Sequence, residues 1–278
     1  MCILCPSRSS LWSARRAFLL AAGATAGSAA LAQVDVGKPS QFRKLVSAQQ
    51  LEAAAAQQYV QTVGEARAKG ALVPDNHPQV QRLRSIARRI IPHTPQWNSR
   101  AAAWNWEINL FQSEQINAFC MPGGKIAFYT GILETLRLTD DEAAMIMGHE
   151  MAHALREHGR ERIGKTQATG MGLSALSQLM GLGDLGNVAA NIGTQLLALQ
   201  FSREDESEAD LVGLELAARS AYVPQAAASL WRKMTAASGG NNSAKFLSTH
   251  PSGPDRIREL EANAPKVQGL YDKARKGA

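Results

Sequence analysis

The chain has 278 residues, a formal net charge of +6, and 45% hydrophobic residues. This length allows one large domain or two small ones, and this apolar fraction is enough to bury a core, so a wholly disordered chain is excluded. Three basic residues, Arg8, Arg15 and Arg16, lie in an N-terminal segment that we expect to be removed, which leaves a charge near +3. So small a charge gives no reason to expect a nucleic-acid partner.

Residues 1–32 have the three parts of an export signal. Arg15-Arg16 precedes an apolar run at residues 17–22, and the segment ends in Ala30-Leu31-Ala32, an A-x-A cleavage pattern. The run is too short and too rich in Gly, Ser and Thr to span a membrane comfortably. The paired arginines fit the twin-arginine route, and an ordinary Sec signal fits equally well. We therefore expect an exported protein without a lipid anchor, since no Cys follows the apolar run at the cleavage site.

Two helices are predicted next, within an N-terminal helical region at residues 33–103. Residues 33–40 are interpreted as a flexible leader, and the Ala- and Gln-rich residues 47–69 predict a helix that ends at Gly70. A second helix begins near Pro78 and ends at Pro92. Its predicted buried face consists of Val80, Leu83, Ile86, Ala87 and Ile90, and its solvated face carries Arg82, Arg84, Arg88 and Arg89.

Three strands are predicted after these helices. Residues 104–110 alternate between apolar and polar side chains, as a half-buried strand does. Residues 116–121 and 125–129 are predicted strands joined by a turn at residues 122–124. Cys120 lies in the second strand, and it has no disulfide partner because Cys2 and Cys5 would leave with the export signal. We interpret Cys120 as a small buried residue rather than as a catalytic thiol.

The segment His149-Glu150-Met151-Ala152-His153 has the form H-E-x-x-H. In a helix, His149 and His153 lie one turn apart on the same face, so both imidazoles can bind one zinc ion. Glu150 can reach a water at that ion without ligating it, which suits a general base. The alternative is a surface helix that carries these residues by coincidence, which is improbable in a chain with six His.

A capped helix is predicted around this motif. Thr139-Asp140-Asp141-Glu142 has the S/T-x-x-E form of a capping box, and its three acids suit the positive end of a helix dipole. Gly159 is the expected C-terminal stop. The helix is therefore predicted to run from about residue 140 to 158, with both His near its middle.

A catalytic zinc ion usually has three protein ligands, and residues 201–210 supply the candidates for the third. Glu206 and Asp210 are spaced i, i+4 and share one helix face. Glu206 could ligate the metal while Asp210 accepts a hydrogen bond from the outer nitrogen of a ligating His. Glu208 points away from Glu206 and is a weaker candidate. The alternative is an ordinary acidic, solvated first turn.

In these residues the chain resembles the M48 zinc metallopeptidases, which include the Ste24, HtpX and Oma1 types. The resemblance rests on H-E-x-x-H, on Ser202-Arg203-x-x-Glu206-x-Glu208-Ala209-Asp210-x-x-Gly213, on residues 117–126, and on Thr249-His250-Pro251-Ser252 followed by Arg256-Ile257. Residues 117–126 and the His250 segment are most similar to the periplasmic branch that includes BepA and LoiP. The resemblance implies a mainly helical α+β fold, with a gluzincin-like metalloprotease domain and a small sheet at residues 104–264, before a basic tail at 265–278.

The resemblance also implies which residues meet the metal and the substrate. In the family the first acid of the E-x-x-x-D pair is the third ligand, which corresponds to Glu206 here. Asn117, Ala118 and Phe119 would lie at the cleft, where an extended substrate could add to the sheet edge. The alternative is a hairpin that simply covers the core.

Two residues near the C-terminus have several interpretations. His250 could donate to the oxyanion, fill the fourth metal position in a self-inhibited state, or cap the following helix. Arg256 could orient Glu206 or Asp210, contact substrate, or form a structural ion pair.

Residues 164–199 are rich in small and apolar residues and poor in charge. Two short buried helices are the favoured interpretation, with a lid or a peripheral membrane contact as further roles and a membrane hairpin as the alternative. His77, His93 and His158 have no partner pattern, and we interpret them as surface residues.

Together these features predict a zinc-dependent endopeptidase of the bacterial periplasm with one Zn²⁺ per chain. The expected substrates are misfolded or unassembled envelope proteins, and Glu150 is the expected general base for a metal-activated water. The alternative is a zinc-regulated chaperone or assembly factor with little protease activity. A peptidase anchored in the membrane through residues 164–199 is a further alternative.

Overall fold

The structure is a computed structural model, and it describes residues 34–168, 196–197, 199–237, 244–250 and 254–277. The predicted mainly helical α+β fold with a small sheet is confirmed. The predicted export signal at residues 1–32 lies outside the described residues. Most of the 164–199 segment does so as well, so neither its predicted helices nor its membrane contact can be placed. None of the helices that the structure describes has both the length and the apolar character of a membrane span.

The N-terminal helices follow the predicted bounds closely. A short 3₁₀ helix, η1 (Gln41–Leu45), leads into α2 (Ala48–Ala68), which Ser47 caps and which Gly70 follows at a φ of +67°. Helix α3 (Pro78–Ile90) buries the five apolar residues predicted for it: Val80, Leu83, Ile86, Ala87 and Ile90. The 3₁₀ helices η2 (Ile91–Gln96) and η3 (Ser99–Ala103) connect α3 to the sheet.

The described strands form a three-stranded sheet in the order β1-β3-β2. Strand β1 (Glu107–Phe111) runs parallel to β3 (Lys125–Tyr129), and β2 (Ala118–Met121) pairs antiparallel with β3 across the predicted turn. The first strand begins three residues later than predicted: Glu107 pairs with Lys125, the first residue of β3, so residues 104–106 precede the start of their partner strand. Strand β2 is thus an edge strand of the sheet that the structure describes.

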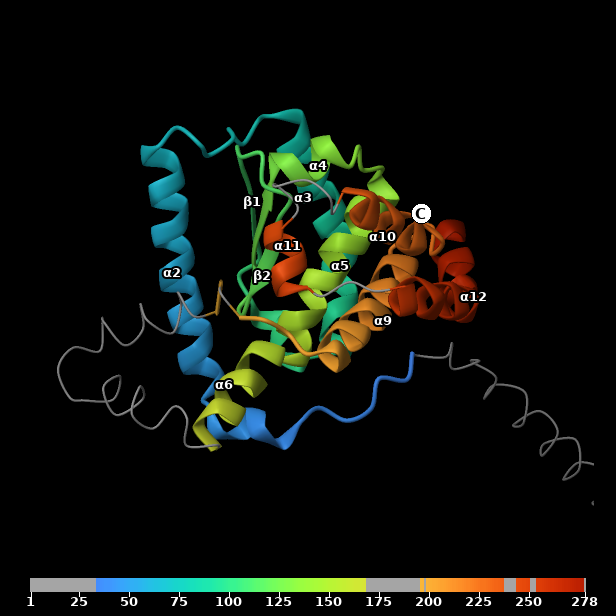
Figure 1. Ribbon diagram of the computed structural model, residues 1–278, viewed down its shortest axis with the longest axis horizontal. Helices are drawn as coiled ribbons and strands as arrows, with labels where there is room; N and C mark the ends of the chain where they lie inside the picture. The colour runs from blue at the N-terminus through green and yellow to red at the C-terminus, as the bar shows by residue number, and fades with distance from the viewer. Residues whose placement is uncertain (1–33, 169–195, 198, 238–243, 251–253, 278) are drawn as a thin grey trace, which may run out of the picture. The chain divides into compact units, whose positions relative to one another are not determined.

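Helices cover both faces of this sheet (Figure 1). Helix α2 lies along one face, where Tyr59 and Val63 pack with Phe111 and Met121. Helix α3 and the central helix α5 (Asp140–Arg156) lie on the other face. The short helix α4 (Thr130–Thr135) connects β3 to α5 in the chain.

Helices α9 (Arg203–Arg219) and α10 (Ala226–Ala237) pack on α5. Helix α12 (Pro254–Lys276) packs on α9 and α10, and the short helix α11 (Ala244–Thr249) lies between α10 and α12 in the sequence. Helices α5 and α9 meet at Gly148 and Gly213, where a Cβ atom on either glycine would lie within 3 Å of the other helix's backbone. This close crossing brings the H-E-x-x-H helix and the acidic helix together. Helix α12 continues through the segment predicted as a C-terminal tail, with Val267 and Leu270 buried.

Two local expectations are wrong. Helix α5 ends at Arg156 rather than at 158, because Glu157 adopts a left-handed conformation with a φ of 63°, and Gly159 lies inside the next helix, α6 (His158–Ala168). Part of the expected flexible leader is packed against the helices. The N–H of Val34 donates to the buried Glu215 carboxylate at 2.6 Å.

Candidate metal centre

The capping box that starts α5 fixes the helix that carries the motif. The Thr139 hydroxyl accepts from the N–H of Glu142 at 3.2 Å, and the Glu142 carboxylate accepts from the N–H of Thr139 at 2.9 Å, as predicted. The helix buries His149 and His153, with their Nε2 atoms 3.1 Å apart. Desolvation lowers the pKa of His153 to about 3, so its ring is neutral and can ligate a metal.

Glu206 reaches the same point from α9. A second capping box, from Ser202 and Asp205, sets the start of that helix. The Glu206 carboxylate lies 3.6 Å from Nε2 of His149 and 3.4 Å from Nε2 of His153. Burial alone would raise the pKa of Glu206, but hydrogen bonds from His153 and His250 and the nearby charges hold it well below its usual range. Glu206 is therefore an anion.

These groups fit a metal ion. One ligand atom each from His149, His153, Glu206 and His250 lies within 4.8 Å of the others, and all four side chains are buried. Imidazole nitrogen and carboxylate oxygen are the donors that zinc accepts. Two neutral rings and one carboxylate would leave the centre near a charge of +1.

The predicted outer partner, Asp210, lies behind His149. Its Oδ1 atom is 3.0 Å from Nδ1 of His149, which leaves Nε2 facing the cluster. Arg256 donates to both acids: its Nε and Nη2 bond to Asp210 at 2.7 and 2.8 Å, and its Nη1 bonds to Glu206 at 2.7 Å. The guanidinium also lies 3.5 Å from the centroid of the Trp231 ring. Among the three roles considered for Arg256, this geometry corresponds to orienting the acids.

Glu150 is buried beside the cluster and does not join it. Its Oε1 atom has no hydrogen-bond partner among the described residues and lies 3.7 Å from Nε2 of His250. Desolvation raises the pKa of Glu150 above its usual value, and the neighbouring imidazoles oppose this shift. A buried carboxylate with an unused oxygen and a raised pKa has the properties of a general base.

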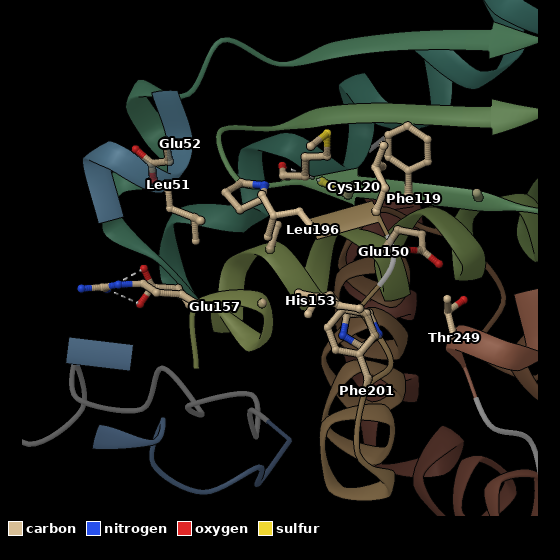
Figure 2. Close-up of a pocket in the computed structure, with 18 of the residues that line it drawn as sticks. Leu51, Glu52, Phe119, Cys120, Glu150, His153, Glu157, Leu196, Phe201 and Thr249 are labelled. Atoms are coloured by element: carbon tan, nitrogen blue, oxygen red, sulfur yellow. Dashed lines mark hydrogen bonds and ion pairs between the residues drawn. The ribbon is translucent and has the colours of Figure 1, made fainter. Parts of the chain in front are cut away.

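A cavity of about 130 Å³ opens in front of Glu150. Its lining includes the predicted edge residues Asn117, Ala118 and Phe119, together with His153 and His250. Figure 2 shows Phe119 and Glu150 near each other in this cavity, with Glu52 and Glu157 at a distance from them. The cavity therefore joins the edge strand β2 to the metal centre.

Cys120 also lines this cavity and is partly exposed, whereas the sequence predicted a buried residue. Desolvation raises the pKa of its thiol well above the usual value. A thiol that resists ionisation is a poor nucleophile, which agrees with the interpretation that Cys120 is not catalytic.

His250 lies inside the cluster. Its Nδ1 atom is 2.9 Å from Oε1 of Glu206 and 3.3 Å from Nε2 of His149. The ring also stacks on Phe246 of α11, with centroids 4.4 Å apart. His250 therefore lies where a fourth metal ligand would lie, which is one of its three predicted roles.

One histidine of the site was also misinterpreted from the sequence. His158, expected at the surface, is buried with its Nδ1 atom 2.9 Å from Nδ1 of His153. His77 is exposed as expected and caps α3, and His93 is half-buried. A spacing of five residues from a ligand is no helical pattern, so no sequence signal pointed to His158.

Fold and site together are those of a metallopeptidase. A model of peptidase family M48 matches residues 76–264, more than half of the chain, so the chain belongs to that family. The mitochondrial metalloendopeptidase OMA1 of Schizosaccharomyces pombe is 35% identical over 199 residues, which cover 71% of this chain and 56% of that protein.

Two bacterial relatives from Escherichia coli are more distant. Metalloprotease LoiP is 26% identical over 204 residues, 72% of this chain and 76% of its own. The beta-barrel assembly-enhancing protease is 25% identical over 203 residues, 68% of this chain and 40% of its own. The resemblance to M48, including its LoiP and BepA branch, is confirmed. The chain spans little more than half the length of the OMA1 relative from S. pombe.

Proposed function

We propose that this chain is a zinc-dependent endopeptidase with His149, His153 and Glu206 as metal ligands, one Zn²⁺ per chain, and Glu150 as general base. One observation carries the proposal. The buried Glu150 has an unused carboxylate oxygen at the point where the ligand cluster meets a cavity. The OMA1 relatives are named metalloendopeptidases and LoiP is named a metalloprotease, which supports the same activity.

The chain's own residues account for most of the chemistry. When bound, a zinc ion supplies Lewis-acid chemistry: it acidifies water and polarises a carbonyl oxygen. Glu150 is positioned to take a proton from the attacking water at Oε1 and to return it to the leaving peptide nitrogen. Asp210 and Arg256 hold His149 and Glu206 in fixed orientations, which reduces reorganisation during the reaction.

The edge strand β2 supplies a means of holding the substrate. Ala118 to Met121 pair with β3 on one side, and no other described strand pairs with them on the opposite side. An extended substrate added along that edge would lie beside Glu150, with Asn117, Ala118 and Phe119 at its backbone. This arrangement suits internal peptide bonds of an unfolded chain.

The proposed substrates and location rest on the sequence and on the bacterial relatives. The export signal predicted at residues 1–32 would deliver the protein to the periplasm. One relative is named for enhancing beta-barrel assembly. These two observations support misfolded or unassembled envelope proteins as the substrates, and envelope quality control as the role.

The position of His250 supports a resting, self-inhibited state. Its ring lies among the ligand atoms, so it would compete with water for the fourth position. In this proposal the side chain must leave the cluster before a substrate can bind. In an oxyanion role His250 would instead stay outside the ligand set and donate to the substrate oxygen.

The test is cleavage of unfolded casein by the purified chain, wild type beside Glu150→Gln. Gln preserves the size of the side chain but cannot accept the water proton, so the variant should retain zinc and lose nearly all cleavage. Equal cleavage by the variant would contradict the assignment of the base. Zinc binding without cleavage by the wild type would favour the chaperone alternative.

A further inference from the structure

His158 begins α6 immediately after the turn that ends α5. Its side chain is 2% exposed, and its Nδ1 atom lies 2.9 Å from Nδ1 of His153. The opposite nitrogen of His153, Nε2, faces His149 and Glu206. His158 therefore contacts the side of the His153 ring that points away from the ligand cluster.

The backbone turns at Glu157, immediately before His158. Glu157 has a φ of 63°, a left-handed conformation that residues other than glycine rarely adopt. Three arginines hold its carboxylate: Arg43 at 2.8 Å, Arg100 at 2.9 Å and Arg160 at 3.0 Å. A disfavoured backbone conformation persists where surrounding contacts hold it, and such positions cluster at functional sites.

The short distance between the two Nδ1 atoms fixes the positions of two protons. A His that ligates a metal through Nε2 carries its proton on Nδ1 and donates it outward. His158 Nδ1 must then be the acceptor, so a neutral His158 carries its own proton on Nε2. That nitrogen has no hydrogen-bond partner among the described residues, and Oε2 of Glu208 lies 3.6 Å from it.

Glu208 completes an arrangement that mirrors the one behind His149. Behind His149, the Nδ1 atom faces Asp210, and Arg256 neutralises Asp210. Behind His153, the Nδ1 atom faces His158, and His158 in turn faces Glu208. Arg156 donates to Glu208. Behind both His149 and His153 there is thus an outer carboxylate that is paired with an arginine.

We propose that His158 is the positioning residue of His153: it accepts the Nδ1 proton, fixes the tautomer in which Nε2 ligates, and orients the ring. This inference deepens the proposed function, because it rests on His153 as a zinc ligand. It assigns His158 no contact with substrate. It also gives Glu157 a role, since its left-handed turn places the acceptor.

The test compares two substitutions by their zinc affinity. His158→Leu keeps much of the volume but removes the acceptor, whereas His158→Asn places an amide oxygen close to the former Nδ1 position. Competition with a chromogenic chelator at neutral pH should show zinc binding about 10- to 100-fold weaker for His158→Leu. His158→Asn should stay close to wild type. His93→Leu is the control, because His93 is half-buried and is not one of the residues of the described ligand cluster.

Equal affinity of His158→Leu and wild type would overturn the proposal, and so would equal losses in the Leu and Asn variants, which would indicate a packing role. If His158→Leu does not fold, a second measurement tests the proposal: ¹⁵N spectra of labelled histidine report the tautomers in the zinc-loaded wild type. A proton on Nε2 of His158 supports the proposal and one on Nδ1 refutes it. Neither readout needs peptidase activity, so a wild type that binds zinc but does not cleave casein contradicts only the proposed function.

Discussion

The close crossing of α5 and α9 depends on Gly148, and Gly148→Ala would disturb it. A Cβ atom at this position would lie 2.7 Å from the carbonyl oxygen of Gly213. Ordinary contacts begin near 3.4 Å, so the helices would have to separate by roughly 0.7 Å. The contacted atom belongs to the backbone, so no side-chain rotation relieves the overlap. His149 follows Gly148, and Glu206 lies about two turns before Gly213, so the separation would pull Glu206 away from the His149 ring.

The expected magnitude combines two opposing effects. Overpacking of a tight core site lowers the free energy of unfolding by about 1–3 kcal/mol. Alanine in place of a helical glycine raises it by about 1 kcal/mol. Because the contact is between backbones, we take the upper part of the first range and expect a net destabilisation of about 1–2 kcal/mol. Zinc affinity should fall on the order of 10-fold, since the displaced Glu206 no longer meets both imidazoles.

Urea denaturation and chelator competition measure these two effects, with Gly64→Ala as the matched control. Gly64 lies within α2, about one turn before the helix ends, where an added Cβ would meet nothing within 4 Å. That variant should be more stable than wild type by about 0.5–1 kcal/mol, with zinc affinity unchanged. A Gly148→Ala protein as stable as Gly64→Ala, with full zinc affinity, would refute the argument that this crossing sets the ligand geometry.

Three further substitutions test the site and its helix. His250→Ala should raise casein cleavage, because it removes the ring that lies among the ligand atoms; a fall in cleavage would favour an oxyanion role. Asp210→Asn should weaken zinc binding by about 10-fold or more in chelator competition, since an amide oxygen is a poorer partner for His149 than a carboxylate, and unchanged affinity would contradict this. Burial alone would raise the pKa of Glu142, but Lys233 and the cap hydrogen bonds lower it below its usual 4.5. Glu142 therefore stabilises the fold above pH 4.5, and this contribution is lost as the pH falls from 4.5 through its folded pKa. Glu142→Gln should accordingly be less stable in urea at pH 7 and approach wild type in acid; a pH-independent difference would show that the charge is not responsible.

The features of the metal centre that depend on residues close together in the sequence could be predicted from the sequence. The capping box at Thr139 spans four residues, so the sequence alone indicates where α5 begins. The spacing of His149 and His153, and that of Glu206 and Asp210, puts each pair on one helix face. The meeting of α5 and α9 also has a local cause, two glycines that permit close approach, but only the fold shows that they face each other.

Local sequence spacing could not identify His158 as a residue of the site. His158 reaches His153 only because Glu157 adopts a left-handed conformation, which a sequence argument assigns to Gly or Asn before it assigns it to Glu. The arginines that hold this turn lie as far as 114 residues away along the chain. The packing of the leader also depends on a contact between distant residues, since the N–H of Val34 binds Glu215, 181 residues later. Long-range pairing of charged or polar groups leaves no local pattern.

Zinc titration of the metal-free protein, followed by casein cleavage, tests the central claim most directly. A metalloendopeptidase with one zinc site should be inactive without metal, gain activity in proportion to added zinc, and reach a plateau at one equivalent per chain. Glu150→Gln should bind the same equivalent and stay inactive throughout. Cleavage that persists without metal, or a zinc-loaded Glu150→Gln protein as active as wild type, would contradict the assignment of this site.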